Sequence, residues 1–268
     1  MDLGLKDRVY VVTGATRGLG RASAEALLAD GAKVLITGRE EKTVADAVAE
    51  LSAGTGTGEG ASAGAGVGAG RVAGVASDNA DPGTPARLIA EARARFGGFD
   101  GILISVGGPA PGFAADNTDE QWAAAFDTVF LGAVRLARAA AETLTEGGVI
   151  GFVLSGSVHE PIPGLTISNG LRPGLAGFAK SLANDLGPRG VRVVGLLPSR
   201  IDTDRVRSLD ALSGDADAAR AANEAAIPLR RYGTPEEFGR TAAFLLSPAA
   251  SYLTGLMLPV DGGARGGF

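Results

Sequence analysis

The sequence contains no cysteine and a single histidine, His159. Without cysteine the chain has no disulfide, no thiol nucleophile and no thiolate ligand for a metal. One histidine leaves no pair of imidazoles for a conventional metal cluster. We therefore expect no metal site, and thiol-dependent enzymes and histidine-rich metalloenzymes are excluded.

The chain also lacks an excess of positive charge and long apolar runs. The chain has 25 Lys and Arg against 30 Asp and Glu, a formal net charge of −5. This balance argues against nucleic acid or an anionic membrane surface as the main partner. No run of about 18 apolar residues is present, so we expect no membrane-spanning helix. The first eight residues lack the basic-then-apolar plan of a secretion signal, and we expect a cytoplasmic protein.

Apolar residues, 45% of the 268, are abundant and regularly spaced. Seven strand-like apolar runs alternate with segments of helical period. The predicted strands cover residues 9–12, 33–37, 71–76, 101–105, 149–154, 191–197 and 256–260. The predicted helices cover residues 21–29, 41–51, 85–96, 119–145, 173–186 and 235–246. Near-continuous apolar strands indicate a parallel sheet with helices on both faces. The sequence thus predicts an α/β fold, a single Rossmann-type doubly wound domain over residues 1–268 with a seven-stranded parallel sheet.

Local signals mark two helix starts and two irregular segments. Thr84 and Thr234 are expected to cap the helices that begin at Pro85 and Pro235. Residues 52–70 contain eight Gly and five Ala, and they predict a flexible surface insertion because they cannot bury enough apolar surface to offset their ordering entropy. Residues 203–227 predict a second loose segment, which we expect to be a mobile lid over the substrate.

A glycine-rich turn follows the first strand and opens the first helix. It reads Thr13-Gly14-Ala15-Thr16-Arg17-Gly18-Leu19-Gly20. Gly14 permits a tight turn, Gly18 lets the backbone approach a pyrophosphate, and Gly20 lets helix and sheet pack closely. The start of the helix adds N–H groups and a positive dipole end. In this position between strand and helix, the pattern predicts a dinucleotide site.

The end of the second strand predicts which dinucleotide is preferred. A fold that selects a 2′-hydroxyl places an acid there, whereas this chain has Gly38 and Arg39. Arg39, helped by Arg17, is suited to pair with a 2′-phosphate. We expect NADP(H) in preference to NAD(H).

These residues resemble the short-chain dehydrogenase/reductase family over nearly the whole chain. The turn at 13–20 is similar to that family's Thr-Gly-x-x-x-Gly-x-Gly, and residues 227–237 and 252–263 are typical of its carboxyl-terminal part. The resemblance implies cofactor contacts for four further residues. They are Asp78 and Asn79 near the adenine, Gly107 in the segment after the fourth strand, and Thr203 at the nicotinamide amide, in a Pro-Gly-x-x-x-Thr segment where Ser199 replaces glycine. It also implies a homodimer or homotetramer built on helices 119–145 and 173–186, and a small-molecule substrate.

The catalytic part of the family pattern is altered. Tyr-x-x-x-Lys is absent, because the residues four positions after Tyr10, Tyr232 and Tyr252 are Gly14, Glu236 and Leu256. By alignment with the family, four positions of the catalytic tetrad are assigned here. They are Ser168 for tyrosine, Arg172 for lysine, Ser155 for serine, with Ser157 as a close alternative, and Val129 for asparagine.

These replacements remove the usual proton path. A serine hydroxyl is a much weaker acid than a phenol. Arg172 stays protonated, so it donates hydrogen bonds but accepts no proton at neutral pH. Val129 offers no hydrogen bond to a relay water. His159, which follows the fifth strand with Glu160, has a suitable intrinsic pKa for acid–base work and is a candidate proton donor beside water and the substrate itself.

Three functions remain open at this point. The first is an NADP(H)-dependent oxidoreductase acting on an unidentified carbonyl or alcohol by a non-standard proton path. In the second, Ser155, Ser168 and Arg172 orient a substrate for a non-redox reaction such as cyclisation, dehydration or isomerisation. The third is a catalytically silent nucleotide-sensing module.

Overall fold

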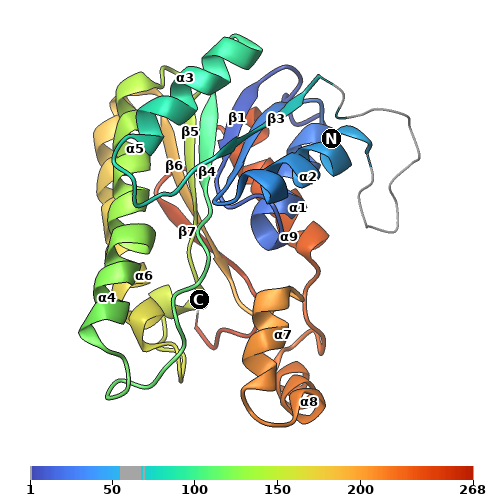
Figure 1. The fold of residues 1–268 in the computed structure, drawn as a ribbon, viewed down its shortest axis with the longest axis vertical. Helices are drawn as coiled ribbons and strands as arrows, with labels where there is room; N and C mark the ends of the chain where they lie inside the picture. Colours follow the sequence, from blue (N-terminus) through green and yellow to red (C-terminus); the bar gives the residue numbers. More distant parts are fainter. Residues whose placement is uncertain (1, 55–67, 69, 268) are drawn as a thin grey trace.

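Seven parallel strands form the centre of the protein in the computed structural model, which describes residues 2–54, 68 and 70–267 (Figure 1). Their order across the sheet is β3-β2-β1-β4-β5-β6-β7. The strands are β1 (Val9–Val12), β2 (Lys33–Gly38), β3 (Val72–Ala76), β4 (Gly101–Ile104), β5 (Val149–Val153), β6 (Arg192–Pro198) and β7 (Leu256–Val260). Chain order reverses direction between β1 and β4, which is the topology of a doubly wound sheet. The predicted fold class is confirmed.

Helices cover both faces of this sheet (Figure 1). One face carries α1 (Gly18–Ala29), α2 (Glu41–Ser52) and α9 (Pro235–Leu246). The other face carries α3 (Thr84–Phe96), α5 (Gly132–Thr143) and α6 (Thr166–Leu186). Each layer buries its own apolar cluster against the strands, which explains why the central strands are apolar on both sides.

Two of the predicted helices are wrong in extent. Residues 119–145 form α4 (Asp119–Ala125), a π-helical turn (Phe126–Leu131) and α5 in place of one continuous helix. α6 begins at Thr166, seven residues before Pro173, so Pro173 lies inside the helix and not in its first turn. Burial of Ile167 and Leu171 in the core offsets the hydrogen bond that the proline cannot make.

The segment 203–227 is helical, so the expectation of a loose segment is wrong. It forms α7 (Asp204–Ala211) and α8 (Ala216–Ala226), which stand apart from the two helical layers (Figure 1). Val206, Ile227 and Tyr232 make a small apolar cluster of their own beneath these helices. Asp210 is buried there, and it accepts hydrogen bonds from Arg200 and from the Tyr232 hydroxyl. Ion pairs and a small core therefore order a sequence that is rich in alanine and charge.

Most of the predicted insertion at 52–70 lies outside the described residues; of its start, Ser52 ends α2. Within the ranges 2–54, 68 and 70–267, no helix is both long enough and apolar enough to cross a membrane.

The two predicted caps behave differently. Thr234 caps α9: its hydroxyl accepts from the Glu237 N–H at 3.3 Å, and the Glu237 carboxylate accepts from the Thr234 N–H at 2.8 Å. Thr84 was predicted to cap α3 but lies within its first turn, where its hydroxyl donates to the Asp78 carbonyl at 2.7 Å. The cap position is Gly83, so the hydroxyl of Thr84 instead holds the loop after β3.

Replacing Thr234 by alanine should lower the free energy of unfolding by about 1 kcal/mol, because the hydroxyl that accepts the Glu237 N–H is lost. Urea unfolding monitored by circular dichroism measures the change. Thr234→Ser keeps the hydroxyl and is the matched control. An alanine variant as stable as the serine variant would contradict the capping role.

Candidate functional site

The loops after all seven strands meet at the carboxyl edge of the sheet. In open α/β sheets the ligand crevice lies outside this edge where the strand order reverses, here between β1 and β4. The glycine-rich turn follows β1, and the segment from Ser105 to Pro109 follows β4. The site is therefore built around these two loops.

The turn after β1 is shaped for glycine at three positions. Gly14 and Gly18 have φ of +57° and +59°, in the left-handed region that glycine favours. A Cβ at Gly14 would lie 2.6 Å from the Ser105 carbonyl oxygen, and one at Gly20 would collide with the Gly14 carbonyl. The roles predicted for Gly14 and Gly20, a tight turn and close packing of helix against strand, agree with these contacts.

The start of α1 is open to an anion. Arg17 occupies the cap position and its side chain makes no capping hydrogen bond. A Cβ on Gly18 would meet nothing nearer than the Thr203 methyl, at 3.9 Å. The first N–H groups of a helix, beside a glycine with free space, fit a pyrophosphate. The residues of the turn thus fit a dinucleotide, and Thr203 lies beside Gly18.

Thr13 contributes by fixing the turn. It is buried, its hydroxyl donates to the Ser105 carbonyl at 2.8 Å, and it accepts from the Ser105 N–H at 2.9 Å. These two bonds join the ends of β1 and β4. Thr16 and Leu19 are half-buried in the same turn.

Thr16 also explains the missing acid at the end of β2. A Cβ on Gly38 would lie 2.6 Å from the Thr16 methyl, so no side chain fits at this position without a shift. The next residue, Arg39, is exposed, as is Arg17. Both arginines thus remain candidates for contact with a 2′-phosphate.

The other predicted cofactor residues follow β3 and β4 at the carboxyl edge of the sheet. Asp78 is exposed after β3, and one of its carboxylate oxygens accepts from the Ala80 N–H at 2.9 Å. The Asn79 carbonyl packs against Gly132 of α5, where a Cβ would lie 2.5 Å away. A Cβ on Gly107 would meet nothing within 4 Å, so the backbone after β4 is open to a ligand.

The structure pairs Ser168 with Ser157, the alternative to Ser155. The hydroxyl oxygens of Ser157 and Ser168 are 3.2 Å apart and both residues are buried. The Ser155 hydroxyl accepts from the Ser157 N–H at 3.1 Å and caps a short 3₁₀ turn (Gly156–Val158). Ser155 is therefore placed to shape this turn, and Ser157 is the serine in contact with Ser168.

Arg172 is an almost fully buried cation, 4% exposed. Its Nη1 donates to the Val153 carbonyl at 2.7 Å and its Nη2 to the Val106 carbonyl at 3.4 Å, while Nε has no hydrogen-bond partner among the described residues. Burial lowers the pKa of Arg172 to about 10, with a smaller contribution from the positive charge of Arg205. It is thus charged at neutral pH and cannot act as a base.

Val129, which the resemblance assigns to the relay position, is apolar. It is buried within the π-helical turn that separates α4 from α5. Its side chain has no atom that could bind a water. Turns of this kind are frequent at functional sites, so the backbone irregularity is present here although the polar side chain is not.

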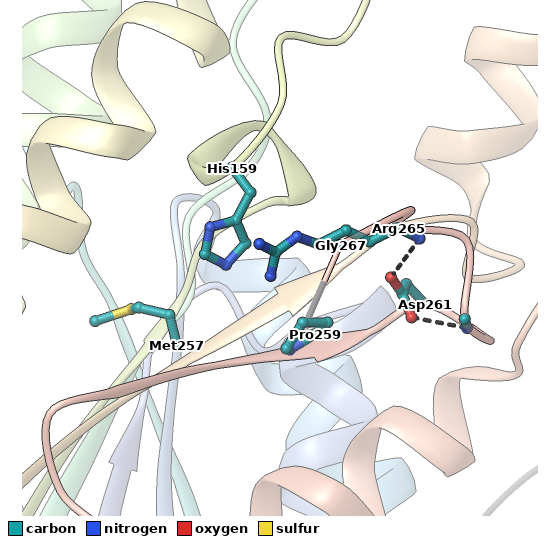
Figure 2. A pocket seen from close by; sticks show the side chains of 7 residues that line it. His159, Met257, Pro259, Asp261, Arg265 and Gly267 are labelled. Carbon is teal, nitrogen blue, oxygen red and sulfur yellow. Dashed lines mark hydrogen bonds between the residues drawn. The ribbon is translucent and has the colours of Figure 1, made fainter.

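His159 lies at the edge of the crevice and makes no side-chain hydrogen bond within the described part of the chain. It lines a cavity of about 490 Å³ together with Met257, Pro259, Asp261 and Arg265. Figure 2 shows its imidazole and the Arg265 guanidinium pointing toward one another. A neighbouring cavity of about 240 Å³ extends from His159 to Gly156 and Ser199. His159 therefore lines two adjoining cavities that include Gly156 and Ser199, but not Ser157 or Ser168.

Two arginines of the site were missed by sequence reasoning. Arg265 follows a turn in which the Asp261 carboxylate accepts from the Gly263 and Arg265 N–H groups (Figure 2). Arg205, on α7, donates to the Pro109 carbonyl at 2.7 Å. Only the tertiary fold brings these residues to the crevice, and neither belongs to a local motif. The sequence gives one indication for Arg205, because it lies two residues after Thr203, a predicted cofactor residue.

Comparison with known proteins shows the family of this chain. The family described as enoyl-(acyl carrier protein) reductase matches residues 14–265. The chain is 31% identical over 268 residues to 3-oxoacyl-(acyl-carrier-protein) reductase FabG of Escherichia coli (strain K12), covering 97% of this chain and 98% of that protein.

Solved structures match the chain from end to end. A short-chain dehydrogenase/reductase described as a glucose/ribitol dehydrogenase, from Brucella melitensis, has a TM-score of 0.86 at 26% identity and covers 100% of both chains. A short-chain dehydrogenase from Burkholderia cenocepacia J2315 in complex with NADP has a TM-score of 0.84 at 29% identity, covering 97% of this chain and 99% of that one.

Replacing Gly14 by alanine should weaken NADPH binding at least about tenfold, because the methyl group would displace Ser105 and distort the turn. Isothermal titration calorimetry measures the affinity, with thermal unfolding alongside. Gly177→Ala is the control, since a Cβ at Gly177 meets nothing within 4 Å and the residue lies in α6. NADPH binding by Gly14→Ala equal to that of the control would contradict the assignment of the turn.

Proposed function

Because this chain belongs to the short-chain dehydrogenase/reductase family, we propose that it is an NADP(H)-dependent oxidoreductase acting on a small carbonyl or alcohol without a tyrosine–lysine pair. The observation that carries the proposal is the glycine turn at the β1–β4 switch point, open at Gly18 and bordered by Thr203. When bound, the nicotinamide supplies or accepts a hydride. The remaining chemistry falls to residues of this chain.

The preference for the phosphorylated cofactor rests on charge and space. Arg17 and Arg39 are exposed at the opening, and Thr16 leaves no room for an acid at Gly38. A 2′-phosphate carries negative charge that two guanidinium groups stabilise, whereas a 2′-hydroxyl gains little from them. The relative from Burkholderia cenocepacia was solved in complex with NADP.

The residues at the tetrad positions position a substrate and do not relay a proton. The Ser157–Ser168 pair can donate a hydrogen bond to a substrate oxygen, but neither hydroxyl is acidic enough to release its proton readily. Arg172 retains its proton and anchors the ends of β4 and β5. The proton is therefore exchanged with His159, with water in the adjoining cavity, or with a group on the substrate.

The lid and the assembly belong to the same proposal. Helices α7 and α8 flank the crevice through Thr203 and Arg205, which suits a lid over the substrate.

The family resemblance supports a homodimer or homotetramer built on α4, α5 and α6. Phe126, stacked on Phe130 with ring centroids 5.2 Å apart, is partly exposed on the π-helical turn beside α4.

Arg39→Asp should reduce the preference for NADPH over NADH by about 1.5–3 kcal/mol, because it removes a charge-assisted contact with the 2′-phosphate. Fluorescence titration of each nucleotide measures the two affinities. Arg95→Asp makes the same change of charge at the far end of α3 and should leave the preference as it is. Equal affinity of the unmodified protein for both nucleotides would contradict the proposed cofactor.

Restoring the family residues should raise activity on simple ketones. The double variant Ser168→Tyr with Arg172→Lys should reduce cyclohexanone faster than the unmodified protein, and adding Val129→Asn should increase the gain toward the 10²–10⁴-fold that a positioned proton donor contributes. NADPH oxidation measured at 340 nm follows the rate, and circular dichroism checks folding.

Two outcomes of this experiment are decisive against the proposal. Rapid ketone reduction by the unmodified protein, insensitive to changes at Ser168 and Arg172, would show that these are not the tetrad positions. Tight NADPH binding without oxidation on any carbonyl compound would favour a non-redox reaction or a silent nucleotide-binding role.

A further inference from the structure

Arg172 and Arg205 carry positive charges that no carboxylate neutralises among residues 2–54, 68 and 70–267. Arg172 is only 4% exposed. It donates to two backbone carbonyls, and its Nε has no hydrogen-bond partner among the described residues. Arg205 is half-buried on α7 and donates to the Pro109 carbonyl. Buried cations are normally paired, so a buried guanidinium without a carboxylate partner needs an explanation.

Two other arginines on α7 and α8 are paired with carboxylates. On α7 and α8, Arg207 bonds to Asp202 and Asp204, and Arg220 bonds to Asp202 and Glu224. Arg192, which is also buried, donates to three backbone carbonyls at the opposite edge of the sheet, and it has no fully buried nitrogen without a partner among the described residues. Arg172 therefore differs from Arg192 in its buried Nε without a partner. Arg205 differs from Arg207 and Arg220 in having no carboxylate partner among the described residues.

The two unpaired charges converge on one loop. Arg172 Nη2 reaches the Val106 carbonyl from α6, and Arg205 Nη2 reaches the Pro109 carbonyl from α7. Between these contacts, a Cβ on Gly108 would lie 3.0 Å from Arg205 Nε, so glycine allows the guanidinium to approach the backbone. The charges are close enough for Arg205 to help lower the pKa of Arg172. Two like charges on one loop create a positive site.

We propose that the substrate of this enzyme carries a carboxylate, which Arg172 and Arg205 bind together at the loop after β4. The inference deepens the proposed function, on which it rests, by naming the substrate class. A carboxylate takes hydrogen bonds from two guanidinium groups in their preferred planar geometry. The cofactor's phosphates are assigned elsewhere, to the start of α1 and to Arg17 and Arg39, so the anion at this loop belongs to the substrate.

Matched acids and esters test the proposal. Levulinate and 5-oxohexanoate are compared with their methyl esters, first for binding to the NADP⁺-loaded protein by isothermal titration calorimetry and then as substrates with NADPH. Each acid should bind at least about tenfold more tightly than its ester, the effect expected when a charge-assisted hydrogen bond is made. Arg205→Met should remove most of this difference while leaving NADPH affinity unchanged.

Two further variants separate binding from folding. Arg172→Lys keeps the charge but loses the unpartnered Nε, and it should reduce the preference for acids while preserving the thermal unfolding temperature better than Arg172→Met. Arg189→Met is the control: Arg189 also donates to a backbone carbonyl, that of Leu144, but lies just before β6 at the opposite edge of the sheet. This control should keep the full preference for acids.

The outcomes distinguish this inference from the proposed function. Esters that bind as tightly as the acids, acids that do not bind at all, or an Arg205→Met variant that loses NADPH and both compounds equally would overturn the carboxylate site. Acids that bind preferentially without any NADPH oxidation would leave the carboxylate site standing and contradict the oxidoreductase. NADPH oxidation with neutral ketones but not with the acids would support the oxidoreductase and contradict the carboxylate site.

Discussion

The contact between the Arg172 guanidinium and the backbone at the ends of β4 and β5 determines the chemistry of the crevice. Its donors hold the Val153 and Val106 carbonyls, and this fixes the loops that carry Ser157 and Gly107. Burying a charge in this way is unfavourable unless each donor is used. One donor, Nε, is left over. The same side chain thus supports the architecture and keeps one unused donor, which in our proposal binds an anion.

The two halves of the crevice are built differently. The half after β1 and β2 has the glycine turn, the buried Thr13 bridge and exposed arginines, all of which suit a phosphorylated dinucleotide. The half after β4 and β5 has the paired hydroxyls of Ser157 and Ser168 and the buried Arg172 guanidinium. In the proposed function these groups replace the phenol and the ammonium that give an ordinary reductase its proton path. Nucleotide binding and proton transfer are separable functions of one scaffold, and in the proposed function only the second departs from the family pattern.

The sequence was sufficient for the sheet and the turn because both depend on local patterns. Seven apolar runs predict seven buried strands, and Gly14 and Gly20 are required by contacts within the β1–α1 unit. The errors arise where tertiary packing overrides a local signal. Pro173 reads as a helix start, yet burial of Ile167 and Leu171 extends α6 past it. α7 and α8 depend on the ion pairs of Asp210 and Asp202, and Arg205 reaches Pro109 across 96 residues. No local pattern predicts such a contact.

Hydride transfer without a phenol is the central claim, and isotope transfer in a single turnover tests it most directly. The protein is mixed with one equivalent of NADPH deuterated at C4 of the nicotinamide, each face labelled in turn, and with a keto acid such as 5-oxohexanoate. The account predicts that deuterium from one face appears on the carbinol carbon of the hydroxy acid, detected by mass spectrometry. NADPH that stays bound and fully labelled with every keto acid and ketone tried would contradict it.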